Sequence, residues 1–211
     1  MGHMVEGVLL SRGHELVAAS KNITETTPET AHDCVCIDFT TPEAFRSNYK
    51  FIAAHFKAAV VGTTGWDDIR EAVVAEFEKQ GTPLIYSSNF SIGVNAVFAA
   101  IEKSAAVLKG HGYVPHIEET HHIHKLDAPS GTAKTMASIV ESSLGTRPDI
   151  TSIREGEVPG IHVVKFKSEV DKIKISHEAF SREGFAEGAV VAAEMTAGLK
   201  GVHTFKELIL K

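Results

Sequence analysis

Apolar and polar positions divide the chain into a first part of alternating strands and helices and a later part that is rich in strands. Up to about Tyr86, short apolar runs predict strands at residues 15–19, 34–39, 58–61 and 84–86. The segments between them predict helices near residues 4–11, 42–54 and 67–80. This alternation is typical of a parallel sheet that is covered by helices.

The pattern changes after a further predicted helix near residues 92–109. Apolar and β-branched runs then predict strands at 113–121, 149–155, 161–168 and 171–179. From Thr132 onward, one helical face collects Ala133, Met136, Ala137, Val140 and Leu144, and Gly145 follows as a helix end. A last helix near 186–197 and the tail 202–210 are expected to return to the first domain. The sequence thus predicts an α/β domain and a separate α+β domain.

The most informative segment is residues 120–132, THHIHKLDAPSGT, which spans a strand end, a short loop and a helix start. Pro129 fixes φ at the loop exit, and Ser130 can cap the first amides of the helix. Gly131 has no side chain to obstruct a ligand, so its amide and that of Thr132 can meet an anion. We therefore expect a carboxylate or a phosphate to bind at this helix start.

The same segment also carries side chains that can exchange protons. Histidine titrates near neutral pH, and Lys125 adds positive charge four residues after His121. His122 and His124 could instead form a metal chelate, since alternate strand residues share a face. No nearby Cys or closely spaced carboxylate completes such a site, and Lys125 would repel a cation. We expect no metal, and a metal-dependent hydrolase that uses His121, His122 and His124 remains the alternative.

Composition narrows the functional classes. The chain has 211 residues, of which 43% are hydrophobic, so it can bury one large core or two small ones. Its net charge of −6 argues against nucleic acid or an anionic membrane as a partner. No apolar run reaches the length of a membrane span, and the first residues lack the features of a signal peptide. A cytoplasmic location is expected.

Four ordered motifs resemble those of the 4-hydroxy-tetrahydrodipicolinate reductase (dihydrodipicolinate reductase) family. Residues 119–133 match every fixed position of the family form E-x-H-H-x-x-K-x-D-A-P-S-G-T-A. Residues 62–65 are similar to its G-T-T-G cofactor loop, and residues 89–95 to its N-F-S-x-G-V-N segment. Residues 177–189 resemble its closing H-x-A-x-S-R-x-x-F-A-x-G-A. The resemblance covers the chain from Asp38 onward.

The resemblance implies a Rossmann-like dinucleotide-binding domain at residues 1–90 and 186–211, and a substrate-binding and oligomerisation domain with a mixed sheet at 91–185. It implies reduction of a cyclic unsaturated dicarboxylate by NADH or NADPH in lysine and diaminopimelate synthesis, by a homotetramer. His121 corresponds to the acid–base histidine and Lys125 to the proton-donating lysine. The positions that hold the substrate carboxylates are His122, Gly131 and Thr132. The expected cofactor contacts are Gly62, Thr63, Thr64, Ser87, Ser88, Asn89 and Phe90, since both loops follow strands of the parallel sheet.

One part of the family pattern is missing. Family members open with a strand and a turn of the form G-x-x-G-x-M-G, of which Met1-Gly2 matches only the last two positions. The missing strand would lie between 15–19 and 58–61, so we expect a gap or a substitute strand there and weakened cofactor binding. Ser20-Lys21-Asn22 occupies the position that normally decides between NADH and NADPH, and these residues leave that choice open.

Overall fold

The structure, a computed structural model, describes residues 1–20, 23 and 26–211. It divides into two compact units, which are treated separately below. Unit 1 comprises Met1–Ile92 and Glu183–Lys211, and unit 2 comprises Gly93–Arg182. Lys21 and Asn22, which bear on the choice between NADH and NADPH, lie outside the described residues.

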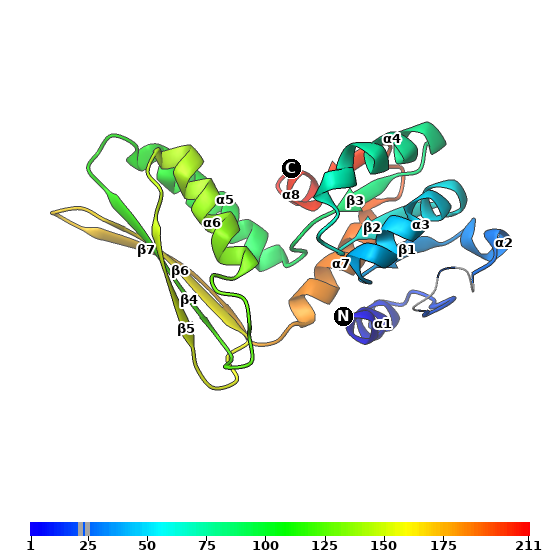
Figure 1. The fold of residues 1–211 in the computed structure, drawn as a ribbon, viewed down its shortest axis with the longest axis horizontal. Helices are drawn as coiled ribbons and strands as arrows, with labels where there is room; N and C mark the ends of the chain where they lie inside the picture. The colour runs from blue at the N-terminus through cyan, green and yellow to red at the C-terminus, as the bar shows by residue number, and fades with distance from the viewer. Residues whose placement is uncertain (21–22, 24–25) are drawn as a thin grey trace. The chain divides into compact units, whose positions relative to one another are not determined.

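Unit 1 is built on a parallel sheet with the strand order β1-β2-β3-β8 (Figure 1). Its strands are β1 (Val35–Asp38), β2 (Ala58–Val61), β3 (Leu84–Tyr86) and β8 (Val202–Thr204), and every neighbouring pair is parallel. The predicted parallel sheet is confirmed, and so is the return of the tail, because β8 pairs with β3.

Helices cover both faces of this sheet. They are α1 (Gly2–Ser11), α2 (Pro28–Ala31), α3 (Pro42–His55), the short 3-10 helix η2 (Asp67–Ile69), α4 (Arg70–Gln80), α7 (Glu183–Met195) and α8 (Phe205–Ile209). Ala59 and Val61 pack against α3 and α4, whereas Val60 packs against α1 and α7. All four residues of β2 are buried, as expected for a central strand of a parallel sheet.

The predicted strand at residues 15–19 is wrong. These residues form no strand, and all of them except Leu16 are exposed. A strand needs a neighbour for its backbone hydrogen bonds, and a short apolar run alone does not provide one. The expected gap beside residues 58–61 is also absent, because β1 pairs with one edge of β2 and β3 pairs with the other. In the described part of unit 1, the edge strands of the sheet are β1 and β8.

Unit 2 is a mixed sheet covered on one face by two helices, with the strand order β5-β4-β6-β7. Its elements are α5 (Ile92–Leu108), β4 (Val114–His121), α6 (Gly131–Leu144), β5 (Asp149–Arg154), β6 (Gly160–Lys167) and β7 (Lys172–Ala179). Only the β4–β5 pair is parallel. Both α5 and α6 lie on the same side of the sheet (Figure 1).

Helix α6 buries the face that the sequence predicts. Its buried residues are Ala133, Met136, Ala137, Val140 and Leu144. Gly145 ends the helix with a positive φ of 86°, a conformation that suits glycine. Together with α5 and the sheet, this face forms the hydrophobic core of unit 2. Across the described parts of both units, no helix is both long and apolar enough to cross a membrane.

Candidate active site

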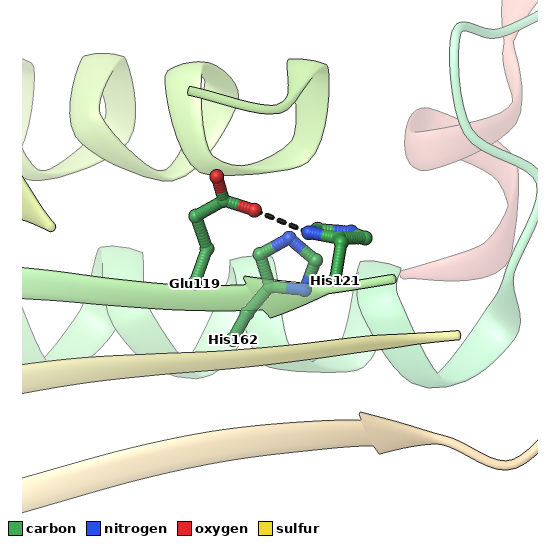
Figure 2. A group of neighbouring side chains, drawn as sticks. All are labelled: Glu119, His121 and His162. Atoms are coloured by element: carbon green, nitrogen blue, oxygen red, sulfur yellow. Dashed lines mark hydrogen bonds and ion pairs between the residues drawn. The ribbon is translucent and has the colours of Figure 1, made fainter. Parts of the chain in front are cut away.

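The candidate site lies at the end of β4, where a strand that faces the helices carries titratable residues. Side chains alternate between the two faces of a strand, so Ile117, Glu119 and His121 point to the same side. All three are buried, whereas Thr120 between them is half-buried on the other face. Figure 2 shows Glu119 and His121 reaching toward each other from the same strand. The alternation therefore places a carboxylate and an imidazole side by side.

Glu119 is the partner of the His121 ring. Its Oε2 is hydrogen-bonded to Nδ1 of His121, and its Oε1 accepts a hydrogen bond of 3.0 Å from Nη2 of Arg154. Burial alone would raise the pKa of Glu119, but hydrogen bonds from Ser152 and Arg154 and the adjacent positive charges hold it below its usual value. Glu119 is therefore a buried carboxylate with both oxygens bonded.

The same surroundings keep His121 neutral. Burial lowers the pKa of His121, Glu119 opposes this effect, and the charges of Lys125 and Arg154 add to it. Since Nδ1 faces a carboxylate, it carries the proton and leaves Nε2 as the free acceptor. Gly160 keeps the space near that atom open, because a Cβ added there would lie 3.1 Å from Nε2 of His121.

A second histidine, His162 of β6, lies beside the first. Its ring meets that of His121 edge-on, with 5.0 Å between the ring centroids (Figure 2). Nε2 of His162 is 3.1 Å from Oγ of Ser130, which also caps α6 by accepting from the amide of Ala133. Burial and the nearby His121 lower the pKa of His162 to about 4. Ser130, the N-cap of α6, is thus hydrogen-bonded to a histidine of the sheet.

The loop between β4 and α6 carries Lys125. Its Nζ lies 2.7 Å from Oδ1 of Asp127, and this contact lowers the pKa of Asp127. Asp127 is therefore an ion-pair partner within the loop. His124 is exposed and pairs with Glu157 at 3.0 Å, whereas Nδ1 of His122 is buried without a hydrogen-bond partner.

The helix start has the geometry that its sequence predicts. Ser130 is the N-cap and Gly131 is the first helical residue, so the positive end of the α6 dipole lies at Gly131 and Thr132. A Cβ built on Gly131 meets no atom within 4 Å, so the approach to its backbone is open. A ligand carboxylate could approach this end of the helix.

His122 and His124 do not share a strand face, because β4 ends at His121, although their ring centroids lie 6.0 Å apart. In the described residues, the group with the spacing of metal ligands is instead Glu119, His121 and His162, with ligand atoms within 4.8 Å of one another. The guanidinium of Arg154 on Glu119 disfavours a cation there. The cluster is better suited to moving protons than to holding a metal.

The expected cofactor loops lie at one edge of the unit 1 sheet, since β2 and β3 are parallel neighbours. After β2, the amide of Gly62 donates to the carbonyl of Asp38 at 2.8 Å, and the hydroxyl of Thr63 donates to the carboxylate of Asp38. The Thr63 side chain is buried, whereas Thr64 is exposed. Asp38 therefore shapes this loop from the end of β1.

The loop after β3 is held in a similar way. Oγ of Ser87 donates to the carbonyl of Asn89 at 2.8 Å and accepts from its amide at 3.1 Å. Phe90 is buried against Phe205, while Ser88 is exposed. Among the expected cofactor residues, Thr64 and Ser88 are exposed, Gly62 and Ser87 are half-buried, and Thr63, Asn89 and Phe90 are buried.

Sequence reasoning missed four residues of these sites: Asp38, Glu119, Arg154 and His162. A signal existed for Glu119, because it precedes His121 by two positions on a predicted strand and so shares its face. Arg154 lies on β5 and His162 on β6. Only the pairing of these strands with β4 places the two side chains beside His121.

Two family profiles match the chain. "Dihydrodipicolinate reductase, N-terminus" matches residues 1–90, and "Dihydrodipicolinate reductase, C-terminus" matches residues 93–209. The chain belongs to the dihydrodipicolinate reductase family. The resemblance stated from the sequence motifs is thereby confirmed.

Two relatives with the name 4-hydroxy-tetrahydrodipicolinate reductase are similar over most of the chain. The 4-hydroxy-tetrahydrodipicolinate reductase of Christiangramia forsetii is 39% identical, covering 99% of this chain and 93% of the relative. That of Methanopyrus kandleri is 37% identical, covering 86% of this chain and 74% of the relative.

Solved structures support the fold. Dihydrodipicolinate reductase from Paenisporosarcina sp. TG-14, solved with dipicolinate bound, superposes with a TM-score of 0.76 at 22% identity and covers 95% of this chain and 84% of that chain. A diaminopimelate dehydrogenase of C. glutamicum gives a TM-score of 0.53 at 10% identity, covering 99% and 92%. The predicted fold class, a Rossmann-like α/β domain with a mixed-sheet α+β domain, is confirmed.

Proposed function

We propose that this chain reduces 4-hydroxy-tetrahydrodipicolinate with NADH or NADPH, in the synthesis of lysine and diaminopimelate. The observation that carries the proposal is the neutral His121 at the end of β4, with Nδ1 engaged by Glu119 and Nε2 beside Gly160. Family membership supports the reaction, because the curated relatives bear the name of this reductase. Such a biosynthetic enzyme is expected in the cytoplasm.

The substrate is a dicarboxylate, and its carboxylates are assigned to the start of α6. The helix dipole and the backbone at Gly131 and Thr132 favour an anion there. His122 adds a buried Nδ1 that lacks a partner and can donate a hydrogen bond. Positive charge on Lys125 also attracts the anionic substrate.

Proton delivery is assigned to His121 and Lys125. His121 exchanges a proton at Nε2, since Nδ1 is held by Glu119. Lys125 is a half-buried ammonium on the adjacent loop, and its pairing with Asp127 at 2.7 Å limits the positions that its side chain can take. These two groups supply the proton that completes the reduction.

A bound nicotinamide cofactor would supply the hydride. The residues proposed to hold it are the two loops of unit 1, Gly62, Thr63, Thr64, Ser87, Ser88, Asn89 and Phe90. They fit such a ligand in that exposed hydroxyls of Thr64 and Ser88 lie at the carboxyl edge of a parallel sheet. Residues 1–90 and 186–211 are accordingly proposed as the dinucleotide-binding domain, and residues 91–185 as the domain for substrate binding and oligomerisation.

Steady-state kinetics with 4-hydroxy-tetrahydrodipicolinate, followed by the absorbance of the reduced nicotinamide, test the catalytic assignment. We expect His121→Ala and Lys125→Ala to lower turnover by about 10²–10⁴-fold, as loss of a positioned acid or base does. His124→Ala is the matched control, since this exposed histidine pairs with Glu157 away from the cluster. Near-normal turnover of both site variants, or equal losses in the control, would contradict the assignment.

Calorimetric titration with NADH and NADPH tests the cofactor proposal separately. Thr64→Val and Ser88→Ala should each weaken nucleotide binding while leaving the buried Asp38 contacts in place. Unchanged affinity in both variants would remove these hydroxyls from the cofactor site.

We also propose that the chain assembles as a homotetramer through the sheet of unit 2. The face of this sheet that lies away from α5 and α6, called the open face below, has no covering helix in the described part of unit 2. Apolar residues sit there in register, with Ile153 and Ile161 on either side of Thr120. Burying such a face against another copy removes apolar surface from water.

A further inference from the structure

Glu119 is a fully buried carboxylate that enters the proposed reaction only as the partner of Nδ1 of His121. A buried charge is costly unless it is paired and hydrogen-bonded. Here one oxygen bonds Nδ1 of His121 and the other accepts from Arg154 at 3.0 Å. Both oxygens of the buried Glu119 carboxylate are therefore bonded, one to an imidazole and the other to a guanidinium.

The first consequence of Glu119 concerns the tautomer of His121. An ionised carboxylate can only accept, so Nδ1 of His121 must donate and Nε2 is left as the atom that exchanges a proton. Without Glu119, the imidazole could place its proton on either nitrogen and rotate about χ2. Its reacting atom would then face the open space near Gly160 for only part of the time.

The second consequence concerns Arg154, which binds more than Glu119. Nη2 also donates to the carbonyl of Asp127 at 2.6 Å, and Nε donates to the carbonyl of Lys125 at 3.3 Å. Both carbonyls belong to the loop that carries the Lys125 ammonium. One guanidinium on β5 thus holds the partner of His121 and the backbone of the Lys125 loop at the same time.

We propose that Glu119 and Arg154 are positioning residues that hold His121 in one tautomer and the Lys125 loop in one conformation through a single ion pair. This inference rests on the proposed function only for its activity measurements. Neither residue needs to touch the substrate. The planar fork of arginine suits the role, because it presents several donors in fixed directions and a lysine would not.

The first experiment removes the charge of Glu119 and keeps its shape. Glu119→Gln should lower turnover about 10- to 100-fold, as loss of a supporting partner typically does, with a smaller change in the KM for the substrate. Because Glu119 raises the pKa of His121, its loss should also move the acidic limb of the pH–rate profile to lower pH. Glu157→Gln is the control, since it alters an exposed Glu–His pair in the same unit.

Nitrogen-15 NMR of histidine-labelled protein reads the tautomer without reference to activity. We expect the Nδ1-protonated form of His121 in the unmodified chain and a shift toward the Nε2-protonated form in Glu119→Gln. The outcome is independent of the reductase assignment, so a chain without reductase activity would still decide the positioning role. An unchanged tautomer together with turnover within about twofold of normal would overturn the proposal.

Arg154 variants test the link to the loop. Arg154→Met should raise hydrogen–deuterium exchange of residues 122–129 severalfold and lower turnover. Arg154→Lys keeps the charge beside Glu119 but loses the fork, so it should keep the His121 tautomer while the loop exchanges faster. Loop exchange and turnover that match the unmodified chain in both variants would overturn the role of Arg154. If Glu119→Gln fails to fold, the tautomer of His121 in the unmodified chain decides the role of Glu119, since an Nε2-protonated ring there would overturn it.

Discussion

At the residue scale, His162 shows how burial controls charge in this site. Its side chain is only 5% exposed, and Nε2 bonds the hydroxyl of Ser130 at 3.1 Å. Burial first, and then the adjacent His121, lower its pKa to about 4. A neutral His162 adds no positive charge beside His121, so it does not compete with that imidazole for the carboxylate of Glu119.

The low pKa of His162 predicts a pH dependence of stability. An unfolded histidine protonates near pH 6.5, whereas the folded one does so only near pH 4. Between these values the unfolded state binds more protons, so the free energy of unfolding falls as the pH falls through this window, by up to about 3 kcal/mol. Urea unfolding from pH 7 to pH 4 measures it. His121 and His177, whose pKa values burial also lowers, act in the same direction.

The matched comparison is between His162→Gln and His124→Gln. The first variant should reduce the loss of stability between pH 6.5 and pH 4. The second should preserve that loss, because His124 is an exposed residue. Identical pH dependence in His162→Gln and the unmodified chain would count against this account of His162.

At the element scale, the contact of α7 with the loop after β3 depends on a glycine. A Cβ at Gly188 would lie 1.6 Å from the carbonyl oxygen of Phe90, so any side chain there must displace the backbone. The ring of Phe90 packs in the same core as Ala186 and Ala189 of α7. Helix α7 therefore fixes the position of a loop that is proposed to bind the cofactor.

Gly188→Ala should consequently destabilise unit 1 and weaken nucleotide binding. Overpacking of a well-packed core costs about 1–3 kcal/mol, and here the clash is with backbone that cannot rotate away. Gly184→Ala in the same helix is the control, since its nearest contact would be Oγ of Ser91 at 3.8 Å. Thermal unfolding and calorimetric titration would compare the two. Equal stability of both variants would show that the close contact of Gly188 with Phe90 does not determine the stability of unit 1.

At the scale of the whole molecule, two units with separate cores carry different sheet types. Unit 1 surrounds a parallel sheet with helices on both faces, which buries β2 completely. Unit 2 covers a mixed sheet on one face only, and β4 accordingly alternates between buried and less buried residues. The open face is the surface on which we propose that copies of the chain associate.

A charge placed on the open face tests this assembly. Val163→Lys stands opposite Glu118 in the register of β4 and β6, so the fold of the single chain should tolerate it. In a tetramer the new ammonium would be buried between copies, which is costly. Light scattering should report a tetramer for the unmodified chain and a smaller species for the variant. A monomeric unmodified chain, or a variant that remains tetrameric, would contradict the proposal.

Local patterns alone predict much of this molecule. The strands at 58–61 and 84–86 follow from short continuous apolar runs, and the buried face of α6 follows from an apolar repeat of every three to four residues. The cap at Ser130 and the helix end at Gly145 follow from local backbone chemistry. The motif around His121 likewise identifies the family, since its residues are contiguous in the sequence.

Only the tertiary structure decides what depends on pairing between distant segments. Residues 16–19 form an apolar run but have no neighbouring strand, so they form none. Arg154 and His162 join the site through the register of β5 and β6 with β4, which no local pattern specifies. The sequence thus determines which residues can carry protons, and the sheet register determines the charge and orientation of the histidines that would do so.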